Sequence, residues 1–180
     1  MPLADDRENR ESLIRAARDA FATGEHVPLE AIAQAAGLGI GTLYRHFPQR
    51  EALVEAVYRE QIEDLRTGAR DLLASERPAQ ALRAWMDLFA DWADTKRGMV
   101  QALAAMRTGG RLDLATSRRE IEAIIATLLT AGARAGDLRA DADPADLRSL
   151  LAGILASASD RGQAARLFDL TIDALRPDRA

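Results

Sequence analysis

Six residues between positions 40 and 46 combine hydrogen-bond donors, an aromatic ring and two positions without a polar side chain. They are Ile40, Gly41, Thr42, Tyr44, Arg45 and His46. On a short helix they lie on the face opposite to Leu43 and Phe47, with the donors placed where the base edges and phosphates of duplex DNA would lie. The pattern fits a DNA-reading helix, and it fits equally a short helix pair of the kind that many helical proteins contain.

Other kinds of chemistry find little support in the sequence. The chain has no cysteine and only two histidines, His26 and His46, which excludes a Cys- or His-rich metal site and leaves carboxylate-only sites open. It carries no Ser/His/Asp or Cys/His set and no phosphate-binding loop. We therefore expect no enzyme activity and no cofactor, although a helical enzyme stays an alternative.

The elements that position the candidate residues are expected to be helices. Alanine contributes 37 of the 180 residues and valine only four, an excess of strong helix formers over β-branched residues. Apolar residues at helical spacing predict a first helix over about 6–23, a short helix from Pro28, a second short helix over about 40–47 and a long helix over about 49–73. Gly37 permits a sharp turn between the short helices, which together with the first helix predict a helix-turn-helix.

Proline and capping signals predict further helices in the remainder of the chain. These helices are expected to begin at or near Pro78, Ser117, Asp143 and Asp160. A short helix is also expected around Met99–Met106. The predicted fold class is therefore all-α.

Charge and hydropathy limit the classes of partner. The formal net charge is −4, and residues 1–50 carry six arginines against seven acidic residues, so any DNA affinity depends on a local arrangement of a few positive groups. No apolar run approaches the roughly 20 residues that span a bilayer, and the polar start MPLADDRENRE does not have the character of a signal peptide. We expect a cytoplasmic, soluble protein with no membrane partner.

Residues 32–53, IAQAAGLGIGTLYRHFPQREAL, closely resemble the N-terminal domain of the TetR/AcrR family of transcriptional regulators. The family pattern is IA-x-x-AG-hydrophobic-x-x-(G)-TLY-x-HF-x-x-(K/R)-E-x-L, and this segment meets nearly every fixed position. The strong resemblance covers about residues 7–58. It implies a helix-turn-helix DNA-binding domain over residues 5–58, joined by a long helix to a helical effector-binding and dimerisation domain over residues 59–180.

The resemblance implies DNA contacts for four residues with fixed family positions. Thr42, Tyr44 and His46 match positions that touch the DNA backbone and bases, and Arg50 matches a basic position at which a phosphate is usually bound. The hydroxyl groups and the Arg50 guanidinium suit phosphate oxygens.

Three further residues match variable family positions that tune sequence preference, namely Ile40, Gly41 and Arg45. An arginine fork matches guanine O6 and N7, so Arg45 is the candidate base reader. Ile40 has no hydrogen-bonding side chain, and its available contact is with a thymine methyl group.

A stretch rich in tryptophan and methionine stands out in a chain with 4% aromatic residues. Such a stripe at helical spacing is more often core than pocket, but the family resemblance implies an effector cavity among the C-terminal helices, so both interpretations stay open. The candidate pocket residues are Trp85, Met86, Phe89, Trp92, Met99, Leu103, Met106 and Ile125.

Two predicted helices, over 117–135 and 144–158, mix large aliphatic residues with small ones that permit close helix approach. A four-helix bundle across a two-fold axis would bury these faces, and the alternative is an internal core pair. The candidate dimer residues are Ile121, Ile125, Leu128, Gly132, Leu147, Leu151, Ile154 and Leu155.

The sequence thus predicts a homodimeric, sequence-specific DNA-binding transcriptional regulator. We expect a repressor that binds a palindromic operator and is released by a small-molecule effector. Besides the helical enzyme, the alternative is an interaction module that keeps the fold without operator binding.

Overall fold

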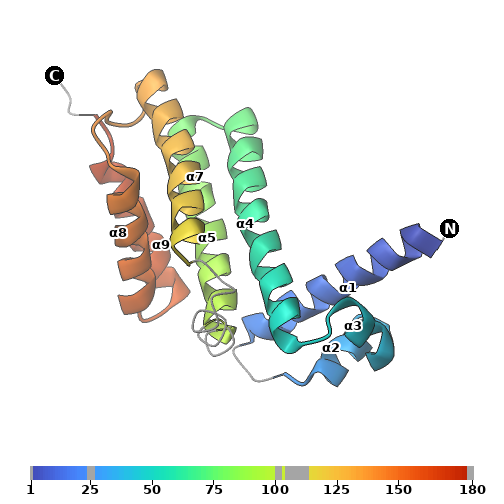
Figure 1. Cartoon of the computed structure of the whole chain (residues 1–180). Helices are drawn as coiled ribbons and strands as arrows, with labels where there is room; N and C mark the ends of the chain where they lie inside the picture. The colour runs from blue at the N-terminus through green and yellow to red at the C-terminus, as the bar shows by residue number, and fades with distance from the viewer. Residues whose placement is uncertain (1, 24–26, 100–102, 104–113, 178–180) are drawn as a thin grey trace. The chain divides into compact units, whose positions relative to one another are not determined.

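The computed structural model describes residues 2–23, 27–99, 103 and 114–177. Within these ranges every regular element is an α-helix (Figure 1), as the alanine-rich composition predicts. The helices are α1 (Pro2–Ala22), α2 (Leu29–Ala35), α3 (Ile40–His46), α4 (Arg50–Ser75), α5 (Pro78–Gly98), α7 (Leu114–Ala135), α8 (Pro144–Ser157) and α9 (Arg161–Ala174). In the described ranges, no helix is both long enough and apolar enough to cross a membrane.

The contacts divide the chain into two compact units. The first unit comprises residues 1–61 and 92–114, and the second comprises residues 62–91 and 115–180. The long helices α4 and α5 therefore each contribute one part to each unit. The proposed domain boundary near residue 58 lies close to the first division, but the assignment of residues 92–114 to the first unit was not expected from the sequence.

In the first unit, α1, α2 and α3 pack on one another and on the first part of α4 (Figure 1). The apolar stripe of α1 lies in the core, and Phe21 is only 1% exposed. Leu43 of α3 and Phe47 directly after it are also buried. Burial of these residues fixes which face of α3 remains available to solvent. The other core residues of these helices are Leu13, Ile14, Ala17, Ile32, Ala33, Leu53, Val54, Val57 and Tyr58.

In the second unit, α8 and α9 form a helical hairpin (Figure 1). Two of the predicted caps begin these helices. The Asp143 side chain accepts hydrogen bonds from the backbone N–H groups of Ala145 and Asp146, at 2.7 and 3.1 Å. Asp160 accepts one from the backbone N–H of Gln163 at 2.7 Å. Each cap satisfies backbone donors that a helix N-terminus leaves without partners.

The predicted capping box at Ser117 is wrong. The helix α7 begins three residues earlier, at Leu114, and Ser117 is a buried residue inside it. The Ser-x-x-Glu pattern indicates a helix start only where the preceding residues do not themselves continue the helix. The short helix expected around Met99–Met106 lies mostly outside the described residues.

Candidate DNA interface and helical core

The turn between α2 and α3 depends on Gly37. This residue has φ +71°, in the left-handed region that favours glycine. The backbone N–H of Gly37 donates to Gln34 O at 3.0 Å, and that of Leu38 donates to Ala33 O at 2.9 Å. These bonds satisfy carbonyl groups at the end of α2 and turn the chain into α3 within a few residues. The glycine turn predicted from the sequence is confirmed.

The helix α3 presents one face to solvent. Tyr44 is 46% exposed, and the side chain of Arg45 is 63% exposed. Thr42 and Ile40 are half-buried. Because Leu43 is fully buried at the centre of the same helix, the core holds the exposed face in place. This face therefore offers a hydroxyl group, an aromatic ring and a guanidinium group on a rigid support.

Gly41 leaves an open position on α3. A Cβ atom built at this residue meets nothing within 4 Å, and the φ of Gly41 does not require glycine. Neither packing nor backbone conformation therefore explains the residue. A glycine at this place leaves room for a partner to approach the helix backbone closely.

His46 does not lie on the exposed face, although the resemblance implies a DNA contact for it. Its side chain is only 7% exposed, and its Nε2 lies 3.4 Å from Oδ1 of Asp6 on α1. The ring also contacts Phe47, with 6.3 Å between ring centroids. Because so little of the imidazole reaches solvent, His46 acts as a contact between α3 and α1 in this structure.

Arg50 is also engaged within the protein. Its Nη1 donates a hydrogen bond to the Val27 carbonyl oxygen at 2.7 Å. The guanidinium lies over the ring of Phe21, 5.5 Å from the ring centroid. Arg50 thereby ties the start of α4 to α1 and to the segment before α2, so a phosphate contact would use its remaining N–H groups.

The seven described candidate pocket residues are all buried. Trp85, Met86, Phe89 and Ile125 belong to the second unit, whereas Trp92, Met99 and Leu103 belong to the first; Met106 lies outside the described residues. Burial agrees with both interpretations left open by the sequence, since side chains that line an enclosed cavity are as buried as those of a packed core.

Trp85 has a specific place in the second unit. Its Nε1 donates a buried hydrogen bond to the Leu65 carbonyl oxygen of α4 at 2.9 Å. Its ring stacks on that of Phe89, with 5.6 Å between centroids. The indole thus joins α4 to α5 by both packing and a hydrogen bond. In the first unit, Trp92 contacts the ring of Tyr58 at 6.1 Å between centroids.

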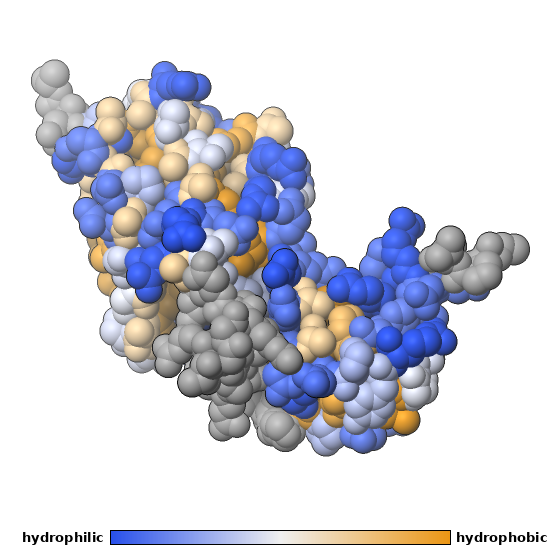
Figure 2. All heavy atoms as spheres, in the orientation of Figure 1, coloured by the Kyte–Doolittle hydropathy of each residue, from blue (hydrophilic) through white to orange (hydrophobic). Residues whose placement is uncertain are grey.

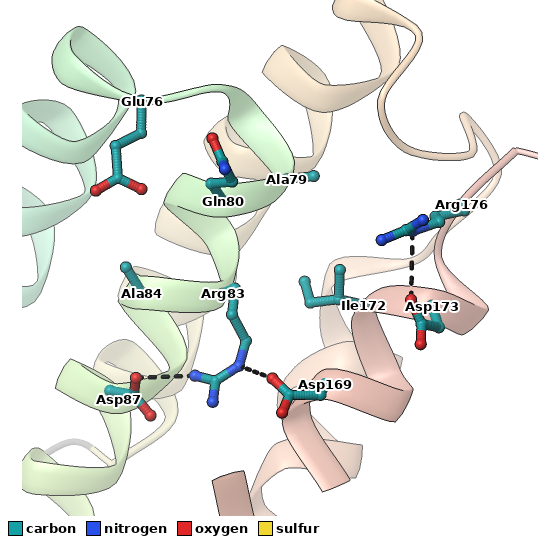
Figure 3. Close-up of a pocket in the computed structure, with 10 residues that line it drawn as sticks. All are labelled: Glu76, Ala79, Gln80, Arg83, Ala84, Asp87, Asp169, Ile172, Asp173 and Arg176. Carbon is teal, nitrogen blue, oxygen red and sulfur yellow. Dashed lines mark hydrogen bonds and ion pairs between the residues drawn. The ribbon is translucent and has the colours of Figure 1, made fainter. Parts of the chain in front are cut away.

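A groove of about 610 Å³ lies between α5 and α9 in the second unit, and none of the predicted pocket residues lines it (Figure 3). Arg83 closes one end, where its Nε donates to Asp169 at 2.5 Å and its Nη1 to Asp87 at 2.8 Å. Burial by itself would lower the pKa of Arg83, but the hydrogen bonds to Asp169 and Asp87 outweigh it and raise the pKa above its usual value. Near the other end, Asp173 pairs with Arg176 at 3.3 Å.

Two arginines of this groove, Arg83 and Arg176, pair with three of its four carboxylates, so the lining keeps an excess of negative charge. Among the described residues, no group of three or more His, Cys, Asp or Glu side chains is arranged to hold a metal ion. The guanidinium of Arg83 also lies over the ring of Phe168, 5.6 Å from its centroid. These contacts of Arg83 with Asp169, Asp87 and Phe168 form a joint, here meaning a set of contacts that holds α9 against α5.

The candidate dimer residues lie mainly inside the subunit. Seven of the eight are buried, and Leu155 is half-buried. Gly132 provides space within its own chain, because a Cβ there would overlap the side chain of Leu138. These side chains form the core of the second unit, so the surface that α7 and α8 offer to a partner is on their opposite faces. Their burial within one subunit favours the internal core pair, the alternative that the sequence left open.

Large apolar residues are exposed on the outer faces of α8 and α9, and Leu88 of α5 is also 38% exposed. Leu150 of α8 is 50% exposed and Leu170 of α9 is 62% exposed. A Cβ built at Gly153 meets nothing within 4 Å. Figure 2 shows hydrophobic residues and residues of intermediate hydropathy interspersed with hydrophilic ones on the visible face of the second unit, whereas the visible surface of α1 is largely hydrophilic.

Comparison with known proteins gives matches along most of the chain. Residues 13–57 match the model of the tetR family of bacterial regulatory proteins, and residues 77–177 match the C-terminal domain of SbtR-like transcriptional regulators. A TetR transcriptional regulator from Streptomyces coelicolor is 42% identical, with a TM-score of 0.86, over 94% of this chain and 99% of that one. The chain belongs to the TetR family of transcriptional regulators. It is a DNA-binding regulator, and the family assignment points away from an enzyme.

Two further relatives agree with this assignment. A TetR regulatory protein from Mycobacterium vanbaalenii is 36% identical, with a TM-score of 0.78, over 98% of this chain and 100% of that one. An HTH-type transcriptional regulator from Staphylococcus aureus is 28% identical over 74 residues, which span 39% of each chain. The chain therefore spans well under half of that curated relative.

Two residues of this TetR protein were missed by the sequence interpretation. Asp6 contacts Arg45 from 39 residues away, a separation that no local pattern reveals. Arg83 has a local signal, since Asp87 lies four residues later on the same helix. Its bond to Asp169 on α9 depends on the tertiary fold and has no such signal.

Proposed function

We propose that this TetR regulator binds a palindromic operator as a homodimer in the cytoplasm, and that a small-molecule effector releases it so that transcription resumes. Residues 5–58 form the DNA-binding domain, and residues 59–180 form the effector-binding and dimerisation domain. The observation that carries the proposal is the division of α3 into a buried and an exposed face, because it leaves Tyr44 and Arg45 in solvent on a helix anchored by Leu43.

The exposed residues of α3 have distinct roles in this proposal. Tyr44 and Thr42 donate hydroxyl groups to phosphates and fix the register of the helix on the duplex. Arg45 directs its guanidinium to a guanine edge, and Ile40 contacts a thymine methyl group. The open surface at Gly41 allows the DNA to approach the helix backbone.

The dimer forms through the outer faces of α8 and α9. Large apolar side chains are exposed there at Leu150 and Leu170, and a second subunit would remove them from water. The open surface at Gly153 allows a partner helix to come close, and a glycine inside a helix otherwise costs about 1 kcal/mol relative to alanine. Both features support this face over that of α7.

The effector acts through α4 and α5. Each of these helices contributes residues to both compact units, so a ligand that shifts either helix in the second unit also bears on a continuous helix of the first. Ligand binding and DNA binding are then linked reciprocally.

Selection from random duplex DNA, followed by binding titrations at several salt concentrations, tests the proposal. We expect a palindrome with half-sites spaced by one or more helical turns of about 10–10.5 base pairs, and an affinity that falls as salt rises. Only asymmetric sequences, or none, would contradict a dimeric reader of DNA.

Two substitutions in α3 separate the proposed roles. Tyr44→Phe removes a phosphate contact and should weaken binding to all sequences alike. Arg45→Ala should relax the preference at one base pair, at a cost of about 1–3 kcal/mol. Equal effects of both variants on operator and random DNA would refute the division of roles.

A further inference from the structure

One carboxylate of α1 contacts both basic residues at the end of α3. Oδ1 of Asp6 lies 3.2 Å from Nη2 of Arg45 and 3.4 Å from Nε2 of His46. The two basic residues are consecutive in the last turn of the helix that the proposed function assigns to DNA reading. Asp6 is thus the acidic partner of that helix within the same unit.

The position of Asp6 is fixed by neighbouring contacts. Arg10 follows one turn later on α1, and its guanidinium lies over the ring of Phe47, 5.3 Å from the centroid. The His46 side chain, which also contacts the ring of Phe47, is 7% exposed. The first half of α1 is therefore packed against the end of α3, and the carboxylate is presented from a helix rather than from a loop.

The contact leaves most of the Arg45 guanidinium available. Only Nη2 bonds to Asp6, and the other N–H groups of Arg45 have no hydrogen-bond acceptor among the described residues. The Asp6 and Arg45 side chains are 53% and 63% exposed, and an ion pair this exposed adds little to fold stability. Its consequence is instead a restriction of the orientation of a long, flexible side chain.

We propose that Asp6 is a positioning residue, which holds the Arg45 guanidinium in one orientation toward a base edge and so determines how strictly that base is selected. The inference rests on the proposed function. A guanidinium ordered before binding loses less side-chain freedom on contact with the correct base. The negative charge of Asp6 meanwhile repels phosphates of every sequence. Asp6 therefore lowers affinity for DNA in general and raises discrimination.

The chain offers a matched control for this inference. Asp5 precedes Asp6 on the same helix, is exposed, and forms no ion pair with any described residue. Asp5→Asn and Asp6→Asn change the net charge equally. Only Asp6→Asn removes the contact with Arg45, whereas Asp6→Glu keeps a carboxylate there.

The experiment titrates wild type and the three variants against the selected operator, against operators with each base pair substituted in turn, and against random duplex. We expect both Asn variants to bind random duplex more tightly than wild type does. Only Asp6→Asn should lower the ratio of operator to substituted-site affinity, by about three- to tenfold and at the base pair lost in Arg45→Ala. Asp6→Glu should restore part of that ratio, and adding Asp6→Asn to Arg45→Ala should lower it no further.

Several results would overturn the inference. If Asp5→Asn and Asp6→Asn change every ratio alike, Asp6 acts only as a charge. A loss of discrimination at base pairs that Arg45→Ala does not affect would assign the effect to a shift of α3 as a whole. If the wild-type protein selects no sequence, the proposed function itself fails. If the wild-type protein selects an operator and Asp6→Asn keeps the same preference, only the inference about Asp6 fails.

Discussion

Gly37 and Gly41 lie four residues apart in the helix-turn-helix, but glycine is present at each for a different physical reason. Gly37 has φ +71°, which an L side chain rarely adopts. Gly41 has no such constraint, and a Cβ there meets nothing within 4 Å. The first glycine serves the turn, and the second leaves space outside the protein.

Alanine substitutions at these glycines should therefore have opposite consequences. Gly37→Ala should destabilise the protein by roughly 1–2 kcal/mol, since its backbone would be held in a left-handed conformation. Gly41→Ala should leave stability unchanged or raise it by up to about 1 kcal/mol, because alanine favours the helix, and should weaken operator binding by placing a methyl group between α3 and the DNA. Denaturant unfolding and operator titration measure the two effects. If Gly41→Ala binds the operator as wild type does, the DNA does not approach α3 at this residue.

His46 and Arg50 show how far single residues can be predicted from a sequence motif. The family motif implied a DNA contact for each of them. Whether a side chain is exposed depends also on residues outside the motif. Here Asp6 lies beside His46 and the Val27 carbonyl accepts from Arg50. Both partners belong to segments that the motif does not include, so the engagement of these residues within the protein could not be predicted.

Local sequence signals predicted the first residue of a helix correctly where a capping side chain or a proline determines it. Asp143 is followed by a proline, which has no N–H group and fits the first turn of a helix, so α8 begins where expected. The Ser117 pattern lacks such a stop and was overridden by residues that extend α7 to Leu114. The joint between α5 and α9 could not be predicted, because it depends on residues that are distant in sequence.

Among the described residues, two ion pairs join α5 to α9, and they should differ in strength. Arg83 is 23% exposed and bonds to Asp169 and Asp87, whereas Arg161 is 45% exposed and pairs with Asp91, which is 73% exposed. We expect Arg83→Gln to lower the free energy of unfolding by about 1.5–3 kcal/mol, the contribution typical of a hydrogen bond to a charged group. Arg161→Gln should cost about 0–1 kcal/mol, as exposed pairs do. Thermal and denaturant unfolding of both variants provides the comparison, and equal losses would show that burial does not set the strength of this joint.

For the subunit and its dimer, the sequence pattern could identify amphipathic helices but not what each helix face packs against. The large aliphatic residues of α7 and α8 were predicted to meet a second subunit, yet Leu128 and Leu151 are fully buried in their own. The subunit core takes the largest side chains because their burial removes the most apolar surface from water. What remains for a partner is the outer face, marked by Leu150, Gly153 and Leu170.

Charge placed on that outer face should separate the subunits. Gly153→Glu and Leu170→Glu each introduce a carboxylate that would be buried without a counter-ion in the proposed dimer, so sedimentation should report helical monomers. Ala123→Glu, on the exposed face of α7, is the matched control and should stay dimeric. A monomer from Ala123→Glu together with dimers from the other two variants would move the interface to α7.

Ligand binding and DNA binding should be coupled through the packing of α4 against α5. Trp85 belongs to the second unit and Trp92 to the first. The Trp92→Phe variant keeps Trp85 as a fluorescent reporter in the second unit, and the Trp85→Phe variant keeps Trp92 as a reporter in the first. Because the Trp85 indole bonds to the Leu65 carbonyl on α4, a compound that shifts α4 against α5 should change the emission of Trp92→Phe. Such a compound should weaken operator binding, and the operator should weaken compound binding by the same factor. A tenfold effect requires only about 1.4 kcal/mol of differential binding. If compounds that saturate this signal leave operator affinity unchanged, the packing of Trp85 is not part of the switch. A response confined to Trp85→Phe would place the ligand-sensitive packing around Trp92 instead.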